Sequence, residues 1–288
     1  STTSQTFMTI SWFTIGMSLF IFSMGFSNLI AWYSNVGRDG SQWNYLVDRI
    51  NALVGPVLVW IIAITTTLNI LLNQNMIPDF LTTFEDGVIS SVEFSLWPLW
   101  MVSIYLVMVM FAPFTIYIHK KYPYLSITTF ITLLMLIDFL NFPINFAYIK
   151  VLNYLFFWLT IPQIGYFFAD GKLQLIKNSI FPIIAIFSYG YLYYQLSINK
   201  TFLSFSNYRL SEMNNEDPPT ALYFVASIGL LSLLFSFKNI IEKFLNKTYL
   251  WKIFSLLHSN IYTLYLWHSM VVLSLYLFGI PIYMGLLY

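Results

Sequence analysis

The chain alternates long apolar stretches with short polar ones. A helix that spans the hydrocarbon core of a bilayer needs about 20 mostly apolar residues. Eight stretches qualify, at roughly 7–33, 51–72, 95–118, 124–140, 150–169, 180–198, 219–237 and 259–279. Most connections between them are short and polar, such as "HKKYP" at 119–123, where Pro123 cannot continue the preceding helix. The pattern predicts an all-α polytopic membrane protein, a bundle of about eight transmembrane helices.

Composition supports the same class. Hydrophobic residues make up 58% of the 288 residues and charged residues only 9%, outside the range of soluble globular domains. The 13 basic residues are scattered and form no stripe that would follow a nucleic-acid backbone, so we expect no nucleic-acid partner. There is no cysteine, and the three histidines lack metal-ligand spacing, so we expect no metal site.

No composition shift, internal repeat or low-complexity tract divides the chain. We therefore expect residues 1–288 to form a single integral membrane domain. The one long loop, 199–218, ends in paired prolines that suit the start of the next helix.

Lysine and arginine predict the orientation, because they are enriched in cytoplasmic loops. Alternate loops divide them unequally, and both chain ends, Ser1 and Tyr288, then lie outside. The richer set, predicted to be cytoplasmic, holds Arg38, Arg49, Lys120, Lys121, Lys172, Lys177, Lys238, Lys243, Lys247 and Lys252, and the poorer set holds Lys150, Lys200 and Arg209. The stretch 238–258 has either of two roles, an amphipathic connector on the anionic inner leaflet or a plain topological anchor.

His268 lies within the apolar run "TLYLWHSMVVL" at 263–273. If the last span begins near residue 259, His268 lies about 14 Å into the membrane at 1.5 Å per residue. Ionisable groups at that depth usually face a bundle interior or a wet cavity, but a neutral imidazole can also simply join two helices. Tyr265, three residues earlier, shares its helix face.

Two arginines precede or open the second span. Arg38 and Arg49 can hold phosphates bidentately, which lysine does less well. The alternative is topological anchoring, with Asp39 and Asp48 neutralising the two guanidinium groups.

Other polar residues lie near the predicted outer side. Trp97 and Trp100, in "SLWPLWMVSIYLVMVMFAPF" at 95–114, fit an aromatic belt at the headgroups, and Tyr105 lies deeper. Asp138 and Asn153 lie near the outer ends of the fourth and fifth spans.

The fifth span continues into "WLTIPQIGYFFADG". Pro162 interrupts its backbone hydrogen bonds beside Gln163, as in broken helices that line a cavity.

These stretches together resemble the acyltransferase-3 family, the multi-span membrane acyltransferases that include O-antigen acetylases. "RINALVGPVLVW", "LWPLWMVSIYLVMVMFAPF", "LNYLFFWLTIPQIGYFFADG" and "LYLWH" follow the family's order and spacing, and "MSLFIFSMGFSNLIAWYSNVGRDGSQW" looks like its second span and the following loop. The resemblance covers nearly the whole chain.

The resemblance implies transfer of an acyl group, acetyl by default, from cytoplasmic acyl-CoA to a hydroxyl of a glycan, lipid or similar acceptor. Acyl-CoA would be a co-substrate rather than a tightly bound cofactor, and the location a cell membrane, the cytoplasmic membrane if the source is bacterial. Carried over by motif, Arg49, Arg38 and Gln163 bind the CoA side, and His268 and Tyr265 act in catalysis. The expected substrate cavity is lined by Trp97, Trp100, Tyr105, Asp138 and Asn153.

The sequence also departs from the family. Relatives usually begin with a further span that carries an arginine and the histidine regarded as the catalytic base, and this sequence lacks that span. We therefore expect an incomplete chain, eight spans of about ten. Two other function classes stay open, a transporter or flippase-like protein and a non-catalytic relative of the family.

Overall fold

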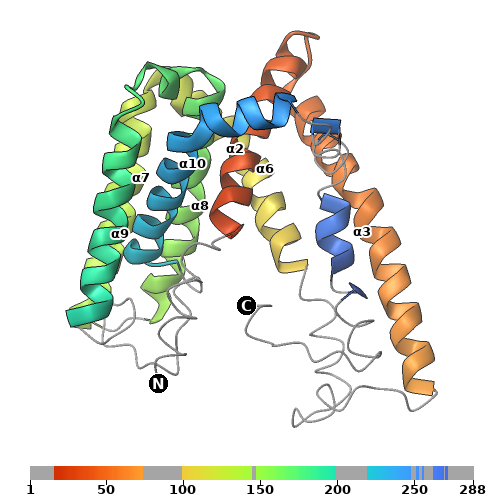
Figure 1. Cartoon of the computed structure of the whole chain (residues 1–288). Helices are drawn as coiled ribbons and strands as arrows, with labels where there is room; N and C mark the ends of the chain where they lie inside the picture. The colour runs from red at the N-terminus through yellow and green to blue at the C-terminus, as the bar shows by residue number, and fades with distance from the viewer. Residues whose placement is uncertain are drawn as a thin grey trace. The chain divides into compact units, whose positions relative to one another are not determined.

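The structure is a computed structural model that describes residues 16–73, 99–144, 147–198, 219–247, 251–252, 255, 262–268 and 270–271. These residues are almost all helical (Figure 1). The named helices are α2 (Gly16–Val36), α3 (Gln42–Asn73), α6 (Leu99–Lys121), α7 (Pro123–Ile144), α8 (Ala147–Ala169), the short 3₁₀ helix η1 (Lys172–Leu175), α9 (Ile180–Ile198) and α10 (Ala221–Lys247).

A helix occupies each of the first seven predicted spans. Of the eighth, the structure describes helical residues 262–268 and 270–271. Four helices are long and apolar enough to cross a membrane, counting only described residues, namely Gly16–Val36, Gln42–Thr67, Leu99–Lys121 and Ala221–Asn246. The predicted all-α membrane fold is confirmed, and the number of spans stays a prediction.

Two helices extend far beyond the predicted spans, by nine or ten residues. The first, α3, begins at Gln42 instead of near residue 51, because Ser41 caps it: Ser41 Oγ accepts the Asn44 backbone N–H over 3.2 Å and donates to Asn44 Oδ1 over 2.6 Å. The second, α10, continues to Lys247, ten residues past the predicted end, with a polar C-terminal part that carries three of its lysines.

The chain divides into two compact units. Unit 1 comprises Ser1–Gly40 and Phe111–Phe244, and unit 2 comprises Ser41–Met110 and Leu245–Tyr288, so that the division falls within α6.

In unit 1, α8 packs between α2 and α7. A side-chain Cβ built on Gly25 would lie 2.6 Å from Pro162 Cα, and one on Gly165 would lie 2.6 Å from Phe26 N, so the backbones of α2 and α8 touch. Gly25 faces Pro162 and, eight residues further along each helix, Tyr33 meets Asp170. The two helices therefore run parallel, and glycine permits their close approach.

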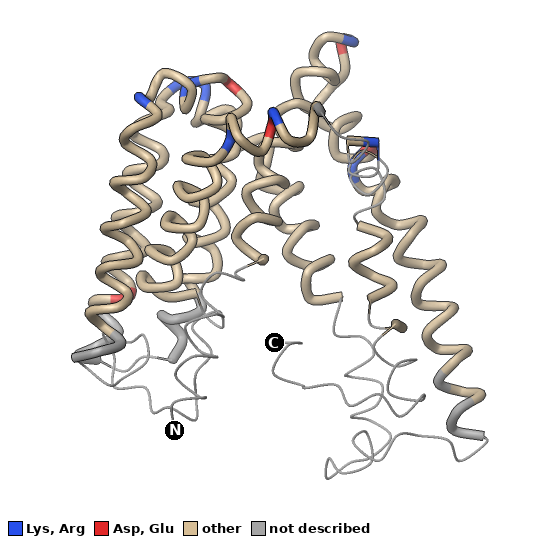
Figure 2. The backbone as a smooth tube through the Cα atoms, viewed as in Figure 1, with Lys and Arg blue, Asp and Glu red and all other residues tan. Residues whose placement is uncertain are grey.

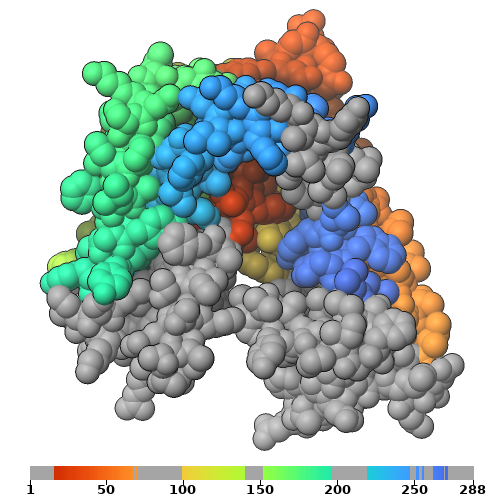
Figure 3. All heavy atoms as spheres, viewed as in Figure 1, coloured from red at the N-terminus to blue at the C-terminus, as the bar shows by residue number. Residues whose placement is uncertain are grey.

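The other helices complete unit 1 around this pair. Ser18 Oγ and Ser227 Oγ share a 2.6 Å hydrogen bond between α2 and α10. On the face shown in Figure 3, α9 and α10 lie side by side, and Gly229 of α10 packs against Ser188 and Tyr189 of α9. An aromatic cluster fills the space between α2, α8, α9 and α10, formed by Phe22, Phe26, Phe168, Phe181 and Phe235.

Basic residues gather at one end of the unit 1 helices, whose long middle parts carry no charged residue (Figure 2). We call this the basic end of unit 1. It is the end predicted to face the cytoplasm.

Unit 2 has its own apolar core. Its buried side chains are Leu53, Trp60, Ile64, Val102 and Leu266, from α3, α6 and the helical residues 262–268. Partly buried side chains, including Tyr105, Tyr262 and Tyr265, pack against this core.

Candidate functional site

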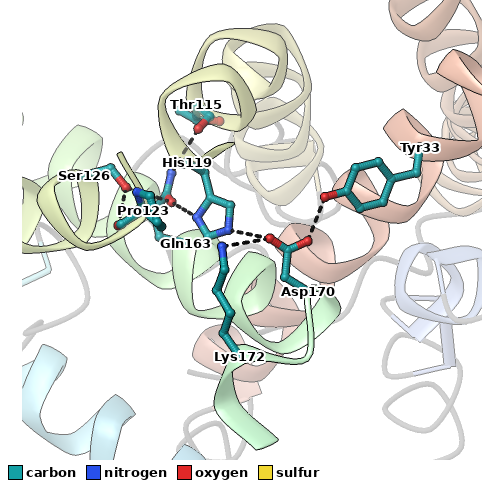
Figure 4. Close-up of polar contacts among 8 residues, drawn as sticks. All are labelled: Tyr33, Thr115, His119, Pro123, Ser126, Gln163, Asp170 and Lys172. Atoms are coloured by element: carbon teal, nitrogen blue, oxygen red, sulfur yellow. Dashed lines mark hydrogen bonds and ion pairs between the residues drawn. The ribbon is translucent and has the colours of Figure 1, made fainter. Parts of the chain in front are cut away.

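A buried polar network lies at the basic end of unit 1, where α2, α6, α7, α8 and η1 meet (Figure 4). Its centre is His119, in the last turn of α6 and fully buried. His119 Nδ1 lies 2.9 Å from Gln163 Oε1, and Nε2 lies 3.2 Å from Asp170 Oδ2. Both ring nitrogens therefore face oxygen acceptors on α8 or directly after it.

Asp170 collects three donors. Besides His119, Tyr33 Oη donates to Oδ1 over 2.7 Å, and Lys172 Nζ lies 3.1 Å from Oδ2. Partial burial acts to raise the pKa of this carboxyl. The hydrogen bonds from Tyr33 and Lys172, with the nearby positive charge, outweigh burial and hold the pKa below its usual 3.8. Asp170 is therefore a stable anion that ties together α2, α6 and η1.

Gln163 extends the network toward the interior of the bundle. Its Nε2 donates to the Thr115 carbonyl over 3.4 Å, and Ser126 Oγ lies 3.3 Å from its Oε1. Thr115 Oγ1 in turn lies 3.0 Å from Tyr166 Oη. Buried polar groups need partners in an apolar surrounding, and here each of these groups has at least one.

Aromatic rings enclose His119. The Phe167 ring meets the imidazole edge to face with centroids 4.9 Å apart, and the Tyr166 ring lies 5.4 Å away. The ring is thus closed off from solvent, and the network holds its position without leaving a free nitrogen.

Three lysines surround this site with their ammonium groups over aromatic rings. The distances from Nζ to the ring centroid are 4.4 Å for Lys120 over Tyr33, 5.5 Å for Lys172 over Phe167 and 5.5 Å for Lys238 over Phe168. Such cation–π contacts restrain side chains that would otherwise move freely in water. These three lysine side chains are therefore held in defined positions at the basic end.

Sequence reasoning placed Gln163 at a functional site but left His119 in a connecting loop. The structure continues α6 to Lys121, so His119 belongs to a helix. One signal was available: Gln163 and Asp170 are seven residues apart, two helical turns, so a helix running through both would carry them on one face. Their shared partner on α6 was not visible in the sequence.

A second cluster lies in unit 2 and contains several of the site residues that the family motifs predicted. The charge of Arg49 acts on the Tyr105 hydroxyl, and the hydroxyls of Tyr105 and Tyr265 both interact electrostatically with that of Tyr262. The rings of Tyr105 and Tyr262 lie 6.2 Å apart. The structure therefore brings together Arg49, Tyr105 and Tyr265 as neighbours, and adds Tyr262, which sequence reasoning did not single out.

His268 and Tyr265 share one face, as predicted. Their rings lie 5.1 Å apart, and His268 Nδ1 is hydrogen-bonded to the Tyr265 backbone carbonyl. This bond occupies one ring nitrogen and fixes the ring against its own helix. A catalytic role for either residue stays a prediction.

The other predicted residues are dispersed. Arg38 follows α2 in unit 1 and donates from Nε to the Ser34 carbonyl over 3.3 Å, whereas Arg49 belongs to unit 2. Asn153 is buried in α8, and no described residue donates a hydrogen bond to its Oδ1. Trp100 is the second residue of α6, and Trp97 lies outside the described residues.

Asp138 makes a structural contact with the start of α10. Its Oδ2 accepts the backbone N–H of Ala221, at the start of α10, over 3.1 Å. A carboxylate at a helix N-terminus satisfies an unpaired N–H and complements the helix dipole. Asp138 therefore caps α10, and its place in a substrate cavity stays a prediction.

Among the described residues, no three His, Asp or Glu side chains come together in a group suited to a metal ion. The fold and the two clusters thus define an all-α membrane protein with polar groups buried between apolar helices. A family model described as an acyltransferase domain matches residues 1–287, and the chain belongs to this family, the acyltransferase-3 family of membrane acyltransferases. The predicted resemblance is confirmed. No curated protein and no solved structure matches the chain.

Proposed function

We propose that the protein is a membrane O-acyltransferase that moves an acyl group, acetyl by default, from cytoplasmic acyl-CoA to a hydroxyl of a glycan, lipid or similar acceptor. The observation that carries this proposal is the unit 2 cluster, in which the charge of Arg49 lies within electrostatic range of the Tyr105 hydroxyl and Tyr105 packs against an apolar core. Membership of an acyltransferase family supplies the reaction class.

The reaction needs few groups. The acceptor oxygen attacks the thioester carbonyl carbon, the C–S bond breaks, and the hydroxyl proton ends on the departing sulfur, so that the products are an ester and free CoA. A guanidinium near a membrane surface can hold CoA phosphates bidentately, and we assign this role to Arg49. We assign His268 and Tyr265 to the acyl group, where a hydrogen-bond donor stabilises developing negative charge.

The unit 1 network contributes differently in this proposal. His119 is closed off from solvent and both its nitrogens are occupied, so it serves as a positioning residue for the basic end. Arg38, five residues after Tyr33 in the chain, is the second candidate for the CoA phosphates.

The test is acyl transfer from radiolabelled acetyl-CoA to endogenous lipid-linked or surface glycan, in membranes that contain the protein. We expect label transfer with the wild-type protein and none without it. No transfer by a folded, membrane-inserted protein would contradict the proposal.

Arg49 variants test the CoA assignment. Arg49→Ala should raise KM for acetyl-CoA more than KM for the acceptor, and Arg49→Lys should recover part of the loss because it keeps the charge without the bidentate fork. Lys177→Ala, which removes one exposed positive charge from unit 1, is the control. Equal effects of Arg49→Ala on both substrates would count against phosphate binding.

His268→Ala tests the proposed role of His268 at the acyl group. We expect lower turnover at unchanged expression, because the variant removes a polar group near the acyl position. Turnover equal to that of the wild type would assign His268 to helix packing.

A further inference from the structure

Trp60 and Tyr262, two side chains of unit 2, each bury a hydrogen-bond donor that has no acceptor among the described residues. Trp60 is fully buried, and its indole Nε1–H has no hydrogen-bond partner among the described residues. The hydroxyl of Tyr262 is likewise buried and has no hydrogen-bond partner there. Both side chains belong to one group: Trp60 is part of the buried core of unit 2, and Tyr262 packs against that core.

A hydrogen-bond donor without an acceptor is energetically unfavourable in an apolar core. A buried donor without an acceptor bears its full desolvation penalty, and the hydrocarbon region offers no water to replace it. Most buried polar groups in proteins therefore have partners, and the exceptions call for a specific explanation. A bound ligand that supplies an acceptor is one such explanation, and Trp60 and Tyr262 are two exceptions that share one core.

The surroundings define the chemistry of the missing acceptor. The indole N–H only donates, and a tyrosine hydroxyl can donate one hydrogen bond. The buried side chains around them are Leu53, Ile64, Val102 and Leu266, all apolar. An uncharged carbonyl oxygen attached to an apolar chain fits both conditions, because it accepts two hydrogen bonds and needs no counter-charge.

His268 is less suited to this task than its place in the sequence suggests. Its Nδ1 is bound to the backbone carbonyl of Tyr265, which leaves a single ring nitrogen for any ligand. Trp60 and Tyr262 each have their donor unused. Trp60 and Tyr262 are therefore further candidates to donate to a carbonyl oxygen, beside the one ring nitrogen that His268 offers.

We propose that Trp60 and Tyr262 form a carbonyl-binding site in unit 2 that takes the carbonyl oxygen of an acyl ester or thioester. The inference rests on the proposed function only for the choice of a thioester, since an ester carbonyl of a membrane lipid has the same acceptor chemistry. In acyl transfer, the same two donors would meet the oxygen that gains negative charge as the acceptor hydroxyl attacks, which makes Tyr262 a further catalytic residue.

Isotope-edited infrared spectroscopy tests the site without requiring turnover. The protein in lipid nanodiscs receives acetyl-CoA labelled with ¹³C at the thioester carbonyl, and a second sample contains unlabelled acetyl-CoA with phosphatidylcholine labelled at its ester carbonyls. A carbonyl that accepts hydrogen bonds absorbs at lower frequency than a free one. We expect a lowered band for bound acetyl-CoA in the wild type, and a partial return toward the free frequency in Tyr262→Phe and in Trp60→Phe.

Kinetics provide the second readout. Tyr262→Phe should lower kcat by about 100-fold, the loss typical of one oxyanion donor, and change KM for acetyl-CoA by less than about 2-fold. Tyr117→Phe, which removes a hydroxyl from a 62% exposed side chain of α6, is the matched control and should leave both the band and kcat unchanged. Thermal unfolding temperatures establish that each variant is folded; Tyr262→Phe removes only one oxygen atom, so it keeps the test valid if Trp60→Phe fails to fold.

The outcomes separate the two proposals. A lowered band that depends on Tyr262 supports the carbonyl site even if no acyl transfer occurs, in which case the proposed function alone fails. A lowered band for the lipid label instead of the acetyl-CoA label also supports the site, and assigns it to a lipid ester. A band unchanged on binding in both samples, or a lowered band that Tyr262→Phe leaves in place, overturns the inference.

Discussion

At the scale of single residues, His119 connects helices of unit 1 through both of its ring nitrogens. One imidazole ring links Gln163 in α8 to Asp170 directly after it, and Asp170 continues the link to Tyr33 in α2. A ring that donates to both acceptors must carry both protons, whereas a neutral ring requires the Gln163 amide to turn its NH₂ group toward Nδ1. Either arrangement joins the same three helices.

His119→Ala should lower the stability of the protein. The substitution leaves Gln163 Oε1 and Asp170 Oδ2 with one partner fewer each, and a weakened buried network of this kind costs about 1–3 kcal/mol. Ser126, Tyr33 and Lys172 still donate to these groups, so we expect no larger loss. The measurement is the thermal unfolding temperature in detergent.

Tyr117→Ala is the control for this experiment, since Tyr117 lies on the same helix with 62% of its surface exposed. Its unfolding temperature should stay near that of the wild type. If His119→Ala unfolds no earlier than Tyr117→Ala, the network contributes nothing to stability.

Asp170 makes a separate prediction about pH. Its pKa is lowered in the folded protein, so its contribution to stability is complete above the ordinary value of 3.8 and is lost as pH falls through the lowered pKa. The wild type should therefore be more stable than Asp170→Asn by a constant amount from pH 8 to about pH 5, and the difference should shrink only at lower pH. Unfolding temperatures measured across this range check the prediction, and a difference that disappears already near neutral pH would refute it.

At the scale of helices, the contact between α2 and α8 positions the network. Gly25 and Gly165 allow the two backbones to touch, which places the end of α2 beside the end of α8 and brings Tyr33 to Asp170. The arrangement follows the small-residue packing common between membrane helices.

Gly165→Ala should separate these helices. The new Cβ would lie 2.6 Å from Phe26 N, a backbone atom that can move only with the whole of α2. We expect a lower unfolding temperature and a weaker link between Tyr33 and Asp170. Gly190→Ala in α9 is the matched control, because its Cβ would meet nothing within 4 Å and alanine favours helix by about 1 kcal/mol over glycine. A Gly165→Ala protein as stable as Gly190→Ala would show that the close approach is dispensable.

The sequence predicted the helices well and their ends less well. Apolar length alone located seven helices, but hydropathy cannot detect a cap, so the start of α3 at Ser41 was missed by nine residues. The start of α10 was predicted to within two residues, and there Thr220 Oγ1 accepts the Tyr223 backbone N–H over 3.2 Å. Its contact with Asp138, 83 residues away in the sequence, was not predicted, because local patterns carry no information about such a contact.

At the scale of the whole molecule, family motifs located one cluster and not the other. Arg49, Tyr105 and Tyr265 were chosen from three separate motifs, and the structure makes them neighbours in unit 2. The unit 1 network was found only in part, because His119 and Asp170 are 51 residues apart and Tyr33 and Asp170 are 137 residues apart. Their pairing depends on how α2, α6 and α8 pack.

The predicted orientation can be tested on the intact protein. The chain contains no cysteine, so a single introduced cysteine reports its own side of the membrane. Lys121→Cys and Lys177→Cys, both exposed residues of unit 1, should react with a membrane-impermeant maleimide only after the cells are permeabilised, because basic loops stay in the cytoplasm. Lys200→Cys, in a loop predicted to lie outside, should react in intact cells.

The labelling results test the helix count and the orientation separately. Lys121 follows α6 and Lys177 precedes α9, so the two positions share a side only if the chain crosses the membrane an even number of times between them, as α7 and α8 predict. Opposite labelling of these two positions would therefore refute the predicted helix count in unit 1. Labelling of both in intact cells would invert the orientation, and the buried network would then face away from cytoplasmic acyl-CoA.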